Sequence, residues 1–178
     1  MDVLLKMSIL FFIGAINGYI IELFYRRFFC LKKWINPGLL KGPYLPLYGF
    51  GIIGLYLLSN IDLPIDNKYL KILILLLMMG ILMTIIEYIT GLIFIKIFHI
   101  KLWDYSNQLF NIQSIICPVF SFFWIVIACI YYFLVNPYII IILNFIQNSL
   151  FLLMFIMMLY ILLIIDLSIC LYNKLIML

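Results

Sequence analysis

The chain has 178 residues, of which 69% are hydrophobic and 10% charged, and its formal net charge is +4. A soluble domain is about 45–50% apolar and about 25% charged. This composition therefore excludes a water-soluble protein, because most of the apolar surface must face lipid. No polar stretch is long enough for a second domain, so we predict a single integral membrane domain over residues 1–178.

A helix needs about 20 apolar residues to cross a bilayer, and the apolar runs predict an all-α, polytopic transmembrane helix bundle of about five spans. The first run is too long for a signal peptide and has no small-x-small cleavage site after it, so we expect it to be retained. Asn136-Pro137 is a turn signal that ends the fourth span, and a short interfacial segment is expected at residues 138–148. The predicted spans are residues 4–25, 44–59, 69–95, 112–135 and 149–172.

The basic residues predict the orientation, because cytoplasmic loops of membrane proteins carry an excess of Lys and Arg. With five spans, eight bases fall on one side and three on the other. This split predicts a multi-pass protein of the cytoplasmic (inner) membrane with its N-terminus outside and its C-terminus in the cytoplasm. The eight are Arg26, Arg27, Lys32, Lys33, Lys41, Lys96, Lys101 and Lys174, and the three are Lys6, Lys68 and Lys71.

Acidic residues inside membrane helices are costly and are usually paired or functional. Glu22, Glu87 and Asp166 all fall toward the predicted cytoplasmic ends of their spans, which predicts a polar cup open to the cytoplasm. Small residues lie at helical spacing beside them, as in Gly14-x-x-x-Gly18, and would let helices approach closely. The candidate cup residues are Glu22, Arg26, Asn36, Lys41, Tyr48, Glu87, Thr90, His99, Trp103, Asp104, Tyr105, Asn111, Ser121 and Asp166.

Purely structural roles explain several of these candidates equally well. Glu22 and Arg26 are four residues apart and could simply pair, and Asp166 could cap a local network. His99 could be an ordinary interfacial residue, and Trp103 could anchor its loop at the headgroup level.

Residues 36–51 contain three prolines and four glycines, which forbid a regular helix through the first two-thirds of the segment. We predict an ordered, irregular segment before the second span, packed against the Glu22 end of the first span and the loop that holds Trp103-Asp104. Irregular backbone at membrane depth must be buried in protein or line a wet cavity. The free N–H groups, with Lys41 beside them, could hold an anion such as a lipid phosphate. A positively charged surface loop is the alternative.

Several classes of activity are not indicated. The four cysteines form no C-x-x-C or Cys/His cluster, so we expect neither a metal site nor a disulfide framework, and no cofactor. There is no Walker A sequence, no H-E-x-x-H and no G-x-S-x-G. Nucleic-acid motifs are also missing, so no nucleic-acid partner is expected.

The chain resembles small bacterial membrane proteins called the putative ABC transporter permease family, also known as putative ABC-transporter type IV. The resemblance covers about residues 18–124 well and Asp166 more loosely. It implies transport but carries no established catalytic or binding residues. It rests on Glu22-x-x-Tyr25-Arg26, Asn36-Pro37-Gly38-x-Leu40-x-Gly42-Pro43-x-x-Pro46-x-Tyr48-Gly49-x-Gly51, Glu87-Tyr88-x-Thr90-Gly91, Trp103-Asp104-Tyr105-Ser106, Asn111-Ile112 and Ser121-x-x-Trp124.

Three functions fit these observations. The first is a permease-like subunit of an ABC-type transport system that lacks its own ATPase, forms a homo-oligomer in the lipid bilayer, and docks a separate ATPase subunit on residues 26–41. The second is a membrane-embedded enzyme acting on a lipid or lipid-linked substrate from the cytoplasmic side. The third is a non-catalytic membrane assembly partner.

Overall fold

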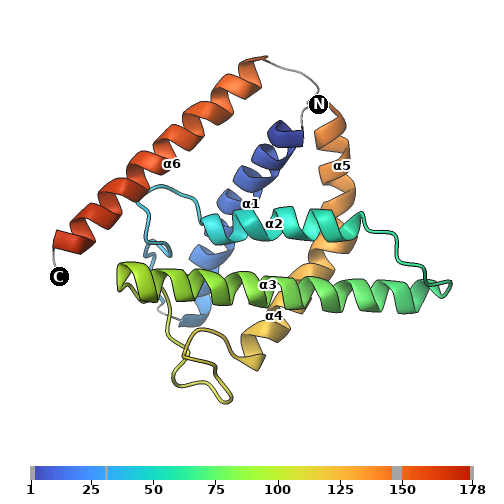
Figure 1. Cartoon of the computed structure of the whole chain (residues 1–178), viewed down its shortest axis with the longest axis horizontal. Coiled ribbons are helices and arrows are strands. Elements are labelled where there is room, and N and C mark those ends of the chain that lie inside the picture. Colours follow the sequence, from blue (N-terminus) through green and yellow to red (C-terminus); the bar gives the residue numbers. More distant parts are fainter. Residues whose placement is uncertain (1–2, 31, 146–149, 177–178) are drawn as a thin grey trace. The chain divides into compact units, whose positions relative to one another are not determined.

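The computed structural model describes residues 3–30, 32–145 and 150–176, which form helices and loops and no named strand (Figure 1). Four helical stretches are long and apolar enough to cross a membrane: Val3–Phe29, Lys68–Phe98, Pro118–Leu143 and Leu150–Asn173. A fifth apolar helix, α2 (Pro46–Ser59), has 14 residues. The all-α architecture is confirmed, and about five spans is consistent with it. The chain divides into two compact units, residues 1–50 with 146–178 and residues 51–145.

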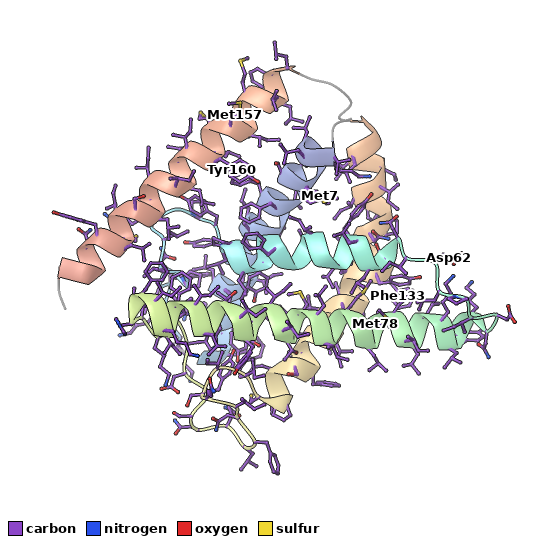
Figure 2. The ribbon with its side chains drawn as sticks, in the orientation of Figure 1. Met7, Asp62, Met78, Phe133, Met157 and Tyr160 are labelled. Carbon is purple, nitrogen blue, oxygen red and sulfur yellow. The ribbon has the colours of Figure 1, made fainter. Side chains whose placement is uncertain are left out.

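The first unit contains α1 (Val3–Tyr25), the start of α2, and α6 (Leu150–Ile176). A π-helical turn, η1 (Arg26–Cys30), continues α1. Aromatic rings join α1 to α6, because Tyr160 stacks on Phe11 at 5.9 Å and meets Phe12 edge-on at 4.8 Å. Figure 2 shows Tyr160 on the side of α6 that faces α1.

Close backbone approach fixes the start of α2 against α1. The Leu45 N–H donates to the Ala15 carbonyl at 2.9 Å. A methyl group on Gly18 would lie 2.1 Å from Tyr48 Cγ, and one on Gly49 would lie 2.8 Å from the Phe11 carbonyl oxygen. Small residues therefore allow this crossing, as predicted for Gly18, because any side chain there would displace the helix.

The second unit contains the rest of α2, the long helix α3 (Lys68–Phe98), α4 (Pro118–Ile130), the π-helical turn η2 (Tyr131–Val135) and α5 (Asn136–Phe145). The Asn67 side chain caps α3 by accepting from the N–H groups of Tyr69 and Leu70. At the other end His99 adopts a left-handed conformation (φ 53°), with its N–H donating to the Phe94 carbonyl.

The face of α3 that carries small residues packs against α4 and the loop before it. A methyl group on Gly80 would lie 2.3 Å from Ile125 Cγ1, and one on Gly91 would lie 2.3 Å from Ile115 Cγ2. Gly80, Glu87 and Gly91 therefore lie on an internal face of the unit.

The fourth predicted span is wrong at both ends. Residues 112–117 are irregular, with the Ile112 N–H donating to the Ile116 carbonyl, and the helix begins at Pro118. Proline suits the first helical turn, where its missing N–H would be unpaired in any case. The left-handed backbone of Gln113 and Ser114 breaks the helix before that point.

Asn136-Pro137 is not the predicted turn, because helix continues through it to Phe145. Proline normally collides with the carbonyl four residues earlier. Here that position lies in η2, where the Asn136 N–H donates to the Tyr131 carbonyl five residues back. This wider π-helical turn accommodates Pro137 inside a continuous helical stretch. The predicted interfacial segment is thus helical to Phe145, and residues 146–149 lie outside the described part of the chain.

We predict that Gly18→Ala lowers thermal stability, although Gly→Ala within a helix normally adds about 1 kcal/mol. The new methyl would lie 2.3 Å from Tyr48 Cβ, which no side-chain rotation can move, and such overpacking costs about 1–3 kcal/mol. Gly54→Ala is the matched control, because its methyl would press on the terminal Leu82 Cδ2 at 2.6 Å and meet its other neighbours at 3.5 Å or more. Melting of the detergent-solubilised protein, followed by circular dichroism, measures both. Equal melting temperatures for the two variants would contradict the prediction.

Candidate functional site

Asp166 of α6 holds the irregular segment that precedes α2. Its Oδ2 accepts from the Gly42 N–H at 2.8 Å and from the Tyr44 hydroxyl at 2.9 Å, and its Oδ1 accepts from the Lys41 N–H at 3.2 Å. The Cys170 thiol adds a longer contact to Oδ1 at 3.6 Å. Part of the amide-rich loop predicted to hold an anion therefore holds the chain's own carboxylate. We call Lys41, Gly42, Tyr44 and Asp166 the Asp166 clamp.

The clamp keeps its tyrosine as a hydrogen-bond donor. Burial, together with the hydrogen bond and negative charge of Asp166, raises the pKa of Tyr44 to about 12. The hydroxyl is therefore protonated at any physiological pH. The side chain of Lys41 is exposed beside the clamp, so the loop presents a positive charge on a fixed backbone.

Asn36 orders the same loop from within. Its side-chain oxygen accepts from the Gly38 N–H at 2.9 Å, and its side-chain nitrogen donates to the Leu40 carbonyl at 2.7 Å. This Asx-type turn replaces the helix that Pro37 and Gly38 forbid. The non-helical segment predicted for residues 36–51 is confirmed for residues 36–45, whereas residues 46–51 already belong to α2.

Glu22 near the end of α1 binds two partners in the first unit. Its Oε1 accepts from the Tyr48 hydroxyl at 3.1 Å, and its Oε2 lies 3.6 Å from Arg26 Nε. The expected i,i+4 ion pair is present, and Tyr48 adds a link to α2. The predicted contact of this segment with the Glu22 end of α1 is therefore confirmed by Tyr48, while its predicted packing against the loop that holds Trp103-Asp104 stays a prediction.

Glu87 is the most deeply buried carboxyl group in the described chain, with 3% of its surface exposed in the middle of α3. Its Oε1 accepts from the Tyr105 hydroxyl at 2.9 Å, and its Oε2 accepts from Trp124 Nε1 at 2.9 Å. Tyr105 stacks on Phe120 at 4.2 Å. We call Glu87, Tyr105 and Trp124 the Glu87 cluster, which ties α3 to α4 and to the loop between them.

The loop between α3 and α4 carries most of the remaining candidates. Trp103 Nε1 donates to the Ile115 carbonyl at 2.7 Å. Asn111 joins the loop internally by donating to Gln108 and accepting from the Ser114 N–H. Asp104 pairs with Lys101 at 2.8 Å and accepts from the Ser106 N–H at 2.8 Å.

The partners of Asp104 lower its pKa to about 2, with the Lys101 hydrogen bond the largest cause. This carboxylate therefore remains charged at neutral pH and is poorly suited to general acid–base chemistry. His99 is exposed and ends α3 with its backbone, which fits the interfacial alternative. Thr90 and Ser121 are half-buried on α3 and α4.

The structure thus brings some of the candidates together in three groups, around Glu22, Asp166 and Glu87. The contacts described above leave the other candidates outside these groups: Thr90, His99, Trp103, Asp104, Asn111 and Ser121. The single cup that would join all three stays a prediction. Tyr44 and Trp124 are missing from the predicted candidate set, although a polar-tipped aromatic side chain in an apolar surrounding needs a hydrogen-bond partner. Among the described residues, no group of three His, Cys, Asp or Glu side chains could hold a metal ion.

The comparisons with known proteins give one result. The family described as "Putative ABC-transporter type IV" matches residues 9–171. The match includes all three groups of polar residues. No curated protein and no solved structure matches the chain.

We predict that Asp166→Asn loosens the loop without unfolding α6. An amide offers one acceptor oxygen instead of two, so at least one of the donors at Lys41, Gly42 and Tyr44 loses its partner. Hydrogen exchange at the amides of Lys41 and Gly42 should become faster by roughly tenfold or more, for a loss of about 1–3 kcal/mol. Ser168→Ala is the control, because its hydroxyl bonds only the Ile164 carbonyl of its own helix. Unchanged exchange in Asp166→Asn would show that the clamp does not hold the loop.

A second prediction concerns the Glu87 cluster. Glu87→Gln and Tyr105→Phe should each destabilise the protein, and the double variant should lose less than their sum. The expected coupling is about 0.5–3 kcal/mol, as found for residues in direct contact. Pairing Glu87→Gln with Tyr69→Phe, an 83% exposed tyrosine at the start of α3, should give additive losses. Denaturant unfolding in detergent measures the free energy of unfolding of each variant. Additive losses for Glu87→Gln and Tyr105→Phe would show that the two side chains are not energetically coupled.

Proposed function

Because the chain belongs to the putative ABC-transporter type IV family, we propose that it is the permease-like membrane subunit of an ABC-type transport system whose ATPase is a separate chain. The sequence contains no Walker A motif to bind ATP itself. Its long apolar helices suit a multi-pass protein of the cytoplasmic membrane. Four or five spans are few for a complete pathway, so we further propose that two or more copies assemble.

The Asp166 clamp is the observation that supports a coupling role. It fixes the loop by two backbone N–H groups and a hydroxyl, so that the loop moves with α6. The Leu45–Ala15 hydrogen bond fixes the end of the same loop to α1. A partner that pushed on the loop would therefore move two apolar helices together. We place ATPase docking on this part of the segment, at residues 37–45 with Lys41 exposed.

The carboxyl groups of Glu22, in the first unit, and of Glu87, in the second, are each proposed as a separate contact for substrate. Both accept hydrogen bonds from aromatic side chains, Tyr48 in one case and Tyr105 with Trp124 in the other. Such groups can exchange a tyrosine or indole donor for a polar group of a passing substrate.

The base-rich side is proposed to face the cytoplasm, with the N-terminus outside and the C-terminus inside. A reporter that is active only outside the cell should therefore stay inactive when fused after Leu178. Activity of that fusion would show that the C-terminus lies outside the cell. Residues 37–45 would then be unable to dock a cytoplasmic ATPase.

Native mass spectrometry of the protein, solubilised from its own membrane, tests the proposed function. We expect a complex that contains a Walker A ATPase and at least two copies of the chain. Lys41→Gln should reduce the bound ATPase by up to about fivefold, the loss expected for one exposed ion pair of about 1 kcal/mol. Lys68→Gln, at another exposed lysine, should leave the amount of bound ATPase unchanged. A chain that binds no ATPase but turns over a lipid-linked substrate would favour the membrane-enzyme alternative.

A further inference from the structure

The end of α1 carries aromatic side chains that are exposed rather than buried. Phe28 is 61% exposed, Phe29 is 80% exposed, and Trp34 is 58% exposed. Phe28 and Phe29 end an apolar stretch that is long enough to cross the membrane, Val3–Phe29, and Trp34 follows that stretch. They therefore lie where a membrane-spanning helix leaves the hydrocarbon layer.

The aromatic rings form an ordered cluster with a basic residue on it. Phe24 stacks on Phe28 at 6.0 Å, and Trp34 meets both rings edge-on, at 5.7 Å and 6.4 Å. The Arg27 guanidinium lies 5.6 Å from the Trp34 ring and 6.0 Å from the Phe28 ring, and it also donates to the Lys32 carbonyl. The cation is thus held on an aromatic surface instead of extending into solvent.

The charge of this surface is strongly one-sided. Arg26, Arg27, Lys32 and Lys33 lie within eight positions, and no acidic residue occurs between Glu22 and Asp62. Glu22 contacts Arg26 alone among these four bases, and Lys33 is exposed. We call Phe24, Arg27, Phe28, Lys33 and Trp34 the aromatic–basic patch.

We propose that the aromatic–basic patch binds the head groups of anionic phospholipids in the leaflet where α1 ends. Aromatic rings favour the headgroup level of a bilayer, and juxtamembrane bases attract anionic lipids. In this arrangement Arg27 and Lys33 donate to a lipid phosphate, while Trp34 and Phe28 insert among the glycerol and upper acyl groups. Continuity with the apolar helix favours a lipid over a soluble anion, because the rings would otherwise remain in water.

This site goes beyond the proposed transport function and does not depend on it. ATPase docking is placed on residues 37–45, whereas the patch precedes Asn36. The test uses the purified chain in nanodiscs with no ATPase present. Failure of either proposal therefore leaves the other standing.

Tryptophan quenching reports lipid at the patch directly. The full-length chain is placed in nanodiscs of phosphatidylcholine with a minor fraction of phosphatidylglycerol, one of the two carrying brominated acyl chains. The Trp34 signal is the difference between the wild type and Trp34→Phe. We expect brominated phosphatidylglycerol to quench Trp34 more than its mole fraction predicts, and high salt to reduce this excess because the attraction is electrostatic.

A charge substitution supplies the matched comparison. Lys33→Gln should weaken the preference for phosphatidylglycerol by about fivefold, the effect of one base near an anionic surface. Lys68→Gln, an exposed lysine outside the patch, should leave the preference unchanged. Both variants should retain the wild-type helical circular dichroism spectrum. The salt titration is done on the wild type, so it tests the proposal even if a variant does not fold.

Three outcomes would overturn the proposal. One is quenching of Trp34 in proportion to the mole fraction of each lipid. Another is an equal loss of preference in Lys33→Gln and Lys68→Gln. The third is displacement of phosphatidylglycerol by millimolar inorganic phosphate at constant ionic strength, which would identify a soluble-anion site instead of a lipid site.

Discussion

A peptide N–H group without a hydrogen-bond partner costs several kcal/mol in hydrocarbon, and this constraint governs the least regular part of the chain. Prolines at positions 37, 43 and 46 prevent the segment before α2 from pairing its amides as a helix. The amides are instead satisfied by Asp166 of α6, by the Asn36 side chain and by the Ala15 carbonyl of α1. The segment is ordered because its polar groups have partners on two neighbouring helices.

Three carboxyl groups of the apolar helices have the same kind of partner, a tyrosine hydroxyl. Glu22, Glu87 and Asp166 each accept a tyrosine hydroxyl from another element, at 3.1, 2.9 and 2.9 Å. A neutral phenol donor stabilises a carboxylate without introducing a second charge that would itself need solvation. The acidic side chains therefore connect helices to neighbouring segments of the chain.

Much of this architecture could be predicted from the sequence, because membrane helices depend on length and apolarity and the Pro/Gly segment depends on backbone chemistry. Glu87 and Asp166 were identifiable because a carboxyl group within an apolar run is costly and is usually paired or functional. Their partners could not be identified in this way, since Tyr44 lies 122 residues from Asp166 along the chain and Trp124 lies 37 residues from Glu87. The helix through Pro137 was also missed. Proline is easily seen in the sequence as a helix breaker, whereas the π-helical turn that accommodates it has no clear sequence signature.

The contact between Gly18 and Tyr48 makes the residue tolerated at one position depend on the residue at the other. The ring of Tyr48 occupies the space that a side chain at position 18 would need, and its hydroxyl is bound to Glu22. A larger residue at position 18 therefore requires a smaller one at position 48, and a smaller residue at position 48 leaves Glu22 without that donor. Substitutions at these three positions should appear together across relatives, as a correlated set, although they come from two helices.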